Sequence, residues 1–302
     1  MKRLYAFLAL TALIASPSIG AEVVITLNES NTFQTIEGFG ASLTDSSSWV
    51  LRYGLTGLER TNLMNQLFSP TNGIGLNILR QPIGASDFRL SNYTYDDMPG
   101  GQTDYGLTNF SIAHDQAYII PLMKQALNVN TNLKIMGTPW SAPAWMKTTT
   151  NFYSGGLKTN CYATYAKYFL KYVQNFASNG LPIFAVSLQN EPLYEPGTYP
   201  GMRMEATNQA QFAVLVGQEF QSNGISPKFL AYDHNWDRFD YPMAVLSNAA
   251  ANPYVSGSAF HAYAGDVSAQ SFVHNAFTNK DIYFTENTAG TWSGTFGDLL
   301  MG

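Results

Sequence analysis

Residues 184–192 read Phe184-Ala-Val-Ser-Leu-Gln-Asn-Glu-Pro192, an apolar run that ends in Asn190, Glu191 and a proline. A short apolar run bounded by turn residues is typical of a buried strand. Proline cannot donate to a strand ladder and restricts the residue before it, so the chain turns directly after Glu191. We therefore expect a carboxylate at the carboxyl end of a buried strand.

The same arrangement recurs along the chain. Short apolar strands, separated by longer amphipathic stretches, are expected at 36–40, 76–80, 133–137, 184–188, 229–232, 258–261 and 282–285. Helices are expected at 56–67, 115–127, 162–178 and 208–222, where apolar residues recur with helical spacing. Strands that alternate with helices predict a parallel α/β sheet, either doubly wound or closed into a (β/α)8 barrel.

Polar residues at the strand ends favour the barrel. Reactive or sugar-binding residue types follow one strand after another: Arg80, Asp87, Trp140, Asn190, Glu191, Asp233, His234, His261, Tyr263 and Glu286. In a barrel these strand ends converge on one face, where the site is built. No G-x-G-x-x-G sequence opens a helix after a strand, which disfavours a nucleotide-binding sheet.

Two of these residues, Glu191 and Glu286, are glutamates that each end an apolar strand. Hydrolysis of a glycosidic bond needs one carboxylic acid to protonate the leaving oxygen. It also needs one carboxylate to attack the anomeric carbon or to assist that attack. Asn190 precedes the first glutamate and can donate a hydrogen bond to a sugar hydroxyl. The pair therefore fits glycoside chemistry.

Other chemistries have less support. The four histidines show no H-x-x-x-H spacing and there is no cysteine cluster, so we expect neither a metal nor a cofactor. His234 and His261 both end strands, and a shared metal site between them stays open. No serine lies in a G-x-S-x-G sequence, and no P-loop is present.

Composition sets wider limits. Hydrophobic residues make up 45% of the chain and charged residues 12%, which excludes a disordered protein and predicts a large core. A net charge of −5 makes nucleic acid an unexpected partner. The single cysteine, Cys161, rules out an intramolecular disulfide and is expected to be structural.

The N-terminus has the order of a secretory signal peptide. Lys2 and Arg3 precede an apolar run at 4–15 and a stretch of small residues, which predicts a signal over 1–20 and export to the extracellular space or periplasm. The run is shorter than the ~20 residues of a membrane span, so no stable membrane insertion is expected. Residues from about 21 to 33 alternate like a strand of an accessory β-domain, at the start of a barrel domain that occupies 21–302.

Several longer segments carry a resemblance to one family. They are Glu37-Gly-Phe-Gly-Ala-Ser-Leu-Thr-Asp45, Ile78-Leu-Arg-Gln-Pro-Ile-Gly-Ala-Ser-Asp-Phe88, Thr138-Pro-Trp-Ser-Ala-Pro-Ala-Trp-Met-Lys147, Gln189-Asn-Glu-Pro192, Phe260-His-Ala-Tyr263 and Phe284-Thr-Glu286. Together they make the chain, from Ile36 to Leu300, resemble glycoside hydrolase family 30, which includes glucosylceramidases and endo-β-1,6-glucanases.

The resemblance implies a (β/α)8 barrel with an attached β-sandwich and a double-displacement mechanism without a cofactor. It assigns the acid/base role to Glu191 and the nucleophile role to Glu286, and it places Arg80 beside the nucleophile. The implied substrate-binding residues are Asp87, Trp140, Asn190, Tyr199, His261 and Tyr263. Trp145 is interpreted as packing, while Asp45, Asp233 and Trp236 are weaker candidates. A nucleophile should be ionised and an acid/base should have a raised pKa.

The substrate is less clear from the sequence. Residues 92–97 and 107–112 look most like the glucosylceramidase branch, which acts in sphingolipid metabolism, so a β-glucoside within a glycolipid is the leading interpretation. Residues 290–293 and 296–298 are also similar to microbial endo-β-1,6-glucanases, which makes glucan the alternative. A carbohydrate-binding fragment without catalysis is the alternative from another class.

The expected strands number seven, whereas the family's barrel has eight strands and a further β-sandwich. We therefore expect a fragment of a longer protein, with two open sheet edges and unpaired backbone groups. We predict that the chain is poorly stable on its own and that the missing portion can leave it inactive. Circular dichroism during thermal melting tests this; a cooperative transition near that of intact relatives would contradict it.

Overall fold

The computed structural model describes residue 26 and residues 28–288, and it divides the chain into two units, 1–37 and 38–302. The proposed signal at 1–20 lies outside the described residues, as do residues 21–25 and 27 of the proposed accessory strand. Residues 28–33 form a turn and irregular chain rather than a strand, and Asn28 Oδ1 accepts hydrogen bonds from Ser30 N and Oγ at 3.1 and 2.6 Å. The strands, helices and strand-end residues described below belong to the second unit, 38–302.

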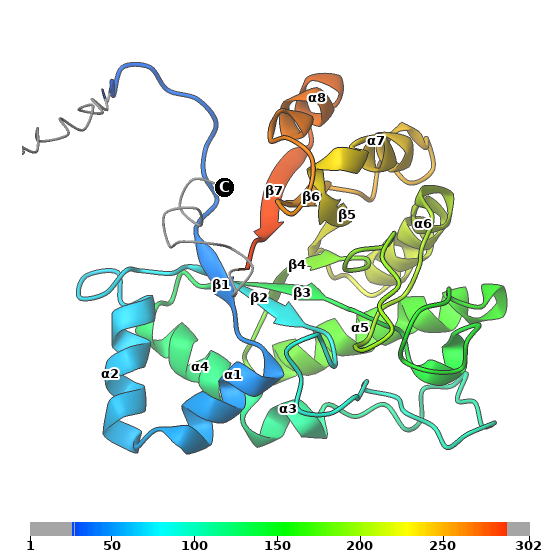
Figure 1. The fold of residues 1–302 in the computed structure, drawn as a ribbon, viewed down its shortest axis with the longest axis horizontal. Helices are drawn as coiled ribbons and strands as arrows, with labels where there is room; N and C mark the ends of the chain where they lie inside the picture. Colours follow the sequence, from blue (N-terminus) through cyan, green and yellow to red (C-terminus); the bar gives the residue numbers. More distant parts are fainter. Residues whose placement is uncertain (1–25, 27, 289–302) are drawn as a thin grey trace, which may run out of the picture. The chain divides into compact units, whose positions relative to one another are not determined.

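This unit is built on one parallel sheet whose strands follow each other in chain order (Figure 1). The strands are β1 (Gly40–Ser42), β2 (Ile78–Pro82), β3 (Lys134–Thr138), β4 (Ile183–Ser187), β5 (Lys228–Asn235), β6 (Gly257–His261) and β7 (Asp281–Glu286). The sheet curls, and within the described residues β1 and β7 are its edges. The strands expected from sequence are confirmed to within a few residues.

Helices connect the strands as right-handed crossovers require. They are α1 (Asp45–Trp49), α2 (Gly57–Phe68), α3 (Ala113–Ala117), α4 (Ile119–Val129), α5 (Tyr162–Ser178), α6 (Ala206–Ser222), α7 (Asp240–Ser247) and α8 (Ser268–Ala276). Short π and 3-10 segments occupy Val50–Gly54, Ala144–Met146, Thr159–Cys161 and Trp236–Arg238. Among the described residues, no helix is long and apolar enough to cross a membrane.

Two boundaries differ from the sequence prediction. The helix expected at 115–127 is interrupted at Tyr118, because Pro121 has no N–H to donate and its ring crowds the carbonyl four residues back. The first strand was expected at 36–40 but begins at Gly40. Phe39 N donates to Asn77 Oδ1 at 2.9 Å instead of to a neighbouring strand, so the strand begins at the next residue, Gly40.

The two faces of the sheet carry different cores. The outer face packs against the helices through a large apolar cluster, in which Tyr165 of α5 stacks on Phe212 of α6 with ring centroids 5.1 Å apart. The inner face holds a smaller cluster with one residue from each of four strands: Met136, Ala185, Leu230 and Ala259. This inner apolar layer lies below the polar residues at the strand ends.

Register explains how one polar residue joins this inner face. Arg80 pairs with Met136 across β2 and β3, and Met136 pairs with Ala185 across β3 and β4. Paired residues of parallel strands point to the same face of the sheet. Arg80 therefore lies on the inner face, in the same layer as the apolar residues Met136 and Ala185.

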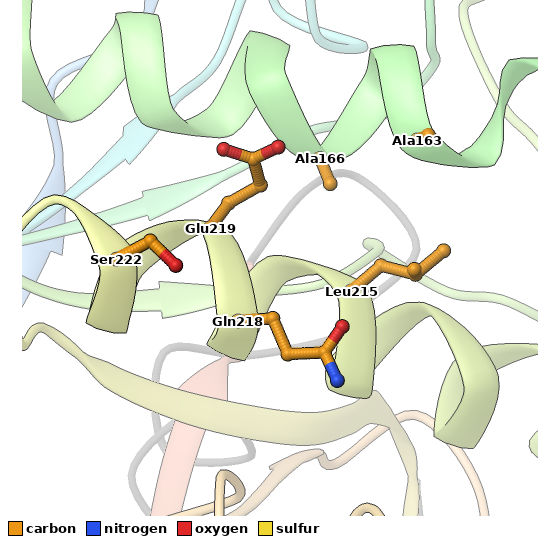
Figure 2. A pocket seen from close by; sticks show the side chains of 6 residues that line it. All are labelled: Ala163, Ala166, Leu215, Gln218, Glu219 and Ser222. Atoms are coloured by element: carbon orange, nitrogen blue, oxygen red, sulfur yellow. The ribbon is translucent and has the colours of Figure 1, made fainter.

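The helical layer has a groove of its own. Figure 2 shows the place where α5 and α6 meet, a groove of about 280 Å³ lined by Ala163, Ala166, Leu215, Gln218, Glu219 and Ser222. The small alanines of α5 leave this space between the helices. None of the strand-end residues singled out by the sequence lines it.

Gly137 tests how tightly the outer core is packed. A Cβ at this position would lie 2.5 Å from Tyr172 Oη of α5, so we expect Gly137→Ala to lower the free energy of unfolding by ~1–3 kcal/mol. The control is Gly57→Ala, where the nearest atom, Arg60 Nη2, is 4.0 Å away. Urea unfolding followed by circular dichroism measures both variants. Equal stabilities of the two variants would show that the α5–β3 contact yields easily.

Candidate active site

A buried guanidinium joins the ends of four strands. Arg80 of β2 donates from Nη1 to Glu286 Oε2 at 2.6 Å, and from Nη2 to Asn190 Oδ1 at 2.8 Å and Asp233 Oδ2 at 3.0 Å. Its side chain is only 6% exposed. The charges of Asp233 and Glu286 outweigh the effect of burial and raise the pKa of Arg80, so it remains a cation. The expected placement of Arg80 beside Glu286 is confirmed.

A buried histidine links the other carboxylate to the same group. His261 at the end of β6 lies with Nδ1 3.2 Å from Glu191 Oε1 and with Nε2 3.1 Å from Asp233 Oδ1. Burial lowers the pKa of His261, but hydrogen bonds to Asp233 and Glu191 dominate and raise it to about 9. At neutral pH both ring nitrogens therefore carry a proton and donate.

The pKa of Glu191 differs from the sequence-based expectation. Burial raises this pKa, but the hydrogen bond from His261 and the charges of His261, His234 and Arg80 lower it by more. The net shift in the pKa of Glu191 is therefore downward. The expected raised pKa is therefore wrong for this state. The physical reason is that His261 is fully buried and protonated against the carboxylate, a neighbour that the sequence could not place.

A bulge in β5 turns Asp233 into this network. The register shifts between Tyr232 and His234, and Tyr232 and Asp233 adopt positive φ angles of 76° and 69°. Glu191 also has a positive φ, 44°, and its N–H donates to Asp233 O at 2.9 Å. Non-glycine residues in this region are strained and concentrate at functional sites. Asp233 was a weak candidate from sequence, and the structure places it at the centre.

The nucleophile candidate is held from two sides. Tyr263 Oη donates to Glu286 Oε1 at 3.0 Å, on the oxygen that Arg80 does not contact. Burial and the charge of Glu286 raise the pKa of Tyr263, so its hydroxyl keeps its proton. The neighbouring Thr285 Oγ1 donates to Asp233 Oδ1 at 2.6 Å. Both carboxylate oxygens of Glu286 thus accept a hydrogen bond.

Above these groups opens a cavity of about 440 Å³. Its lining residues are Asp87, Phe88, Trp140, Asn190, Glu191, Tyr194, Tyr199, His234, Asn235, Tyr263, Glu286 and Thr288. Arg80 and His261 lie beneath it, bonded to the two glutamates. The structure therefore brings together every catalytic and substrate-binding residue expected from the sequence.

The spacing of the glutamates decides what they can do. An oxygen of Glu191, an oxygen of Glu286 and a ring nitrogen of His261 all lie within 4.8 Å of one another. A metal ion fits this group by residue type, and His234 is not part of it. A protonated His261, however, has no lone pair to offer at neutral pH. The short spacing suits two carboxyl groups that act on one glycosidic bond, one at the anomeric carbon and the other at the leaving oxygen.

The expected sugar-binding residues have different surroundings. Trp140 is 5% exposed, and the Arg80 guanidinium carbon lies 5.0 Å from the centre of its ring. Burial raises the pKa of Asp87, and the charge of Glu286 adds to that shift. Burial likewise raises the pKa of Tyr199, with the charge of Glu191 as the next cause. The Tyr199 hydroxyl therefore keeps its proton and is available as a hydrogen-bond donor.

Three further residues, one expected to pack and two expected as weaker site candidates, lie outside the cavity lining. Trp145 is confirmed as packing, since it is buried and its Nε1 donates to Asp96 O at 3.0 Å. Asp45 is buried elsewhere, where it accepts from Leu90 N at 2.7 Å and contacts His114 and Tyr118. Trp236 stacks on Phe284 at 5.6 Å and is not among the residues that line the cavity.

Sequence reasoning missed some lining residues: Phe88, Tyr194, Asn235 and Thr288. All four carried a usable signal, because each lies within three residues of a strand-end residue already singled out. Asn235 also accepts a hydrogen bond from Tyr263 N at 3.2 Å.

The family model of the glycosyl hydrolase family 30 TIM-barrel domain matches residues 36–297. The chain belongs to glycosyl hydrolase family 30. Its seven strands and their helices are those of a (β/α)8 barrel that is open between β1 and β7 within the described residues.

Named members of the family resemble the chain over most of its length. It is 37% identical to an endo-1,6-beta-D-glucanase of Trichoderma harzianum, over 86% of this chain and 56% of that protein. It is 30% identical to the lysosomal acid glucosylceramidase of Mus musculus, over 90% and 55%. A solved endo-beta1,6-glucanase superposes with a TM-score of 0.82 at 34% identity, over 89% of this chain and 61% of that one. The chain thus spans about half the length of the curated relatives it matches.

The site makes stability depend on pH through His261. Its folded-state pKa of about 9 lies above the unfolded value of 6.5, so its stabilisation is complete below pH 6.5 and is lost as pH rises towards 9. The loss is on the order of 3 kcal/mol. We expect urea unfolding of the wild type to show this decline and His261→Gln to flatten it. The control is His274→Gln on the exposed side of α8, which should keep the wild-type slope. A wild-type slope in His261→Gln would contradict the assignment.

Proposed function

We propose that the protein containing this chain is a retaining β-glycosidase that hydrolyses β-glucosides by double displacement. One observation carries the proposal: oxygens of Glu191 and Glu286 lie within 4.8 Å of each other, at the ends of β4 and β7. Retaining enzymes hold their carboxyl groups about 5–5.5 Å apart, whereas inverting enzymes need about 6.5–9.5 Å to admit a water. The close approach of one oxygen of each glutamate supports the shorter, retaining arrangement.

In the first step, Glu286 attacks the anomeric carbon and forms an ester bond while the bond to the leaving oxygen breaks. Glu191 transfers a proton to that oxygen, which departs as a neutral alcohol. In the second step, Glu191 takes a proton from water, the water oxygen bonds to the anomeric carbon, and Glu286 leaves as a carboxylate. Arg80 and Tyr263, each bonded to one oxygen of Glu286, orient it for attack.

Glu191 is anionic in the free site and needs a proton for the first step. His261 Nδ1, 3.2 Å from Glu191 Oε1, is a proton donor already in hydrogen-bond contact. Its other nitrogen faces Asp233, whose pKa is held well below the usual range by Arg80 and His261 despite burial. The arrangement supports a proton shared between His261 and Glu191 that reaches the leaving oxygen through the carboxyl group.

For the substrate, we favour a β-1,6-linked glucan over a glucosylceramide. The sequence features at 92–97 and 107–112 favoured the glucosylceramidase branch. The relatives named endo-1,6-beta-D-glucanase, however, are 37, 36 and 35% identical to this chain, and those named glucosylceramidase are 34% identical or less. A binding protein without catalysis is disfavoured because both glutamates lie in the cavity with their partners.

We also propose that the protein is exported. The proposal is supported by the order of basic, apolar and small residues over 1–21. A polymeric substrate outside the cell is compatible with this location.

Covalent trapping tests the mechanism. After incubation with a 2-deoxy-2-fluoro-β-glucoside bearing a good leaving group, intact mass and peptide mapping should show one adduct, on Glu286. Glu286→Gln should form none. Glu191→Gln should still be labelled, because a good leaving group needs no protonation, but its hydrolysis of β-1,6-glucan should fall by about 10²–10⁴-fold. An adduct on another residue, or none on the full-length protein that contains this chain, would contradict the assignment.

A further inference from the structure

Asp87 lines the cavity from a segment, residues 86–90, that follows β2. Burial raises the pKa of Asp87, and the charge of Glu286 raises it further, so the two carboxyl groups lie near each other. The neighbouring side chains of Phe88 and Leu90 are 48% and 53% exposed. Apolar burial therefore contributes little to the position of this segment, and polar contacts must hold it.

Two residues of α1 supply such contacts to the backbone that follows Asp87. Asp45 Oδ2 accepts a hydrogen bond from Leu90 N at 2.7 Å. Ser46 N and Ser46 Oγ both donate to Phe88 O at 3.1 Å. Asp45 is only 2% exposed, so water does not compete for its carboxylate. The segment is thus fixed to a helix whose residues, all of them described, lie outside the cavity lining.

The carboxylate of Asp45 is itself held in one orientation. Its Oδ1 lies 2.9 Å from His114 Nε2 and accepts a hydrogen bond from Tyr118 Oη. Tyr93 stacks on His114 with the ring centroids 3.7 Å apart and keeps the imidazole in place. Burial raises the pKa of Asp45, but hydrogen bonds from His114, Tyr118 and Leu90 N lower it by more, so the group is an anion. With both oxygens engaged, the carboxylate stays directed at Leu90 N.

Stabilisation of α1 does not account for these contacts of Asp45. A carboxylate in the first turn of a helix also interacts favourably with the helix dipole. The N-cap of α1 is Thr44, however, whose Oγ1 accepts from Ser47 N at 3.4 Å. Both oxygens of Asp45 contact groups outside α1, and one of those groups is the backbone of the segment that carries Asp87.

We propose that Asp45 is a positioning residue that acts through Asp87: it holds the backbone of residues 88–90 so that the Asp87 carboxyl group lies in the cavity near Glu286. This inference rests on the proposed function and deepens it, because it adds a buried group outside the cavity to those that determine how the substrate is held. A displacement of about 1 Å at a substrate-contacting group is enough to lower the rate by about 10²-fold. The hydrogen bond from Leu90 N to Asp45 prevents such a displacement of the segment.

A double-mutant cycle between Asp45 and Asp87 tests the proposal in the full-length protein that contains this chain. The measured quantity is the second-order rate constant with which the 2-deoxy-2-fluoro-β-glucoside labels Glu286. Asp45→Ala should lower this constant by about tenfold or more when Asp87 is present. In the Asp87→Ala background the same change should lower it by less than about twofold, because no carboxyl group is left to position. Asp45→Asn, whose amide oxygen still accepts from Leu90 N, should remain within about threefold of wild type.

Glu59→Ala is the matched control. Glu59 is a carboxylate in the first turn of α2 that accepts from Thr56 N at 2.9 Å and does not line the cavity, so its removal should leave the labelling rate unchanged. Circular dichroism during thermal melting shows whether each variant is folded. If Asp45→Ala does not fold, Ser46→Ala replaces it in the cycle. This variant removes only the Oγ contact with Phe88 O, and the expected loss is about twofold to tenfold.

The outcomes separate this inference from the proposed function. Equal losses from Asp45→Ala with and without Asp87 would show that Asp45 acts on the fold as a whole; they would overturn the inference and leave the proposed function standing. An unchanged labelling rate in folded Asp45→Ala, or a loss in Asp45→Asn as large as that in Asp45→Ala, would overturn it in the same way. A wild type that is not labelled on Glu286 would overturn the proposed function, and this inference with it.

Discussion

The guanidinium of Arg80 holds together the ends of β2, β4, β5 and β7, because its nitrogens bond to Glu286, Asn190 and Asp233 within 3.0 Å. A buried cation is costly unless it is fully paired, and the carboxylates around it are equally costly without the cation. Each charged group therefore depends on the others being in place. The curled sheet makes this possible, since only a curl brings the second and seventh strands to the same point.

The same constraint explains the local strain. Asp233 can reach both Arg80 and His261 only because β5 bulges after Tyr232 and places two successive residues at positive φ. Such conformations cost on the order of 1–3 kcal/mol each and persist where the surroundings determine them. Here the surroundings include two charged partners and the N–H of Glu191, which donates to Asp233 O. The strain is thus offset by the ionic network that it completes.

The inner apolar layer lies below the charged groups around Arg80, and the loops above them form the wall of the cavity. Met136 and Leu230 belong to that layer, while Tyr194 and Tyr199 belong to the wall. Low-dielectric walls strengthen each electrostatic contact in the site. These charges set where the protons lie. Asp233 stays ionised, His261 stays protonated, and Glu191 is an anion beside a proton donor.

Much of this could be predicted from the sequence by itself. Alternating apolar strands and amphipathic helices determined the parallel fold. Asn190-Glu191-Pro192 and the strand that ends in Glu286 determined the two carboxylates, because a turn residue after an apolar run marks a strand end. Only the tertiary structure decided the importance of Asp233 and the lowered pKa of Glu191, since both depend on a bulge and on His261, which is 70 residues away in the chain. Local patterns report which face a residue takes, whereas charge interactions depend on distances through space that no local pattern contains.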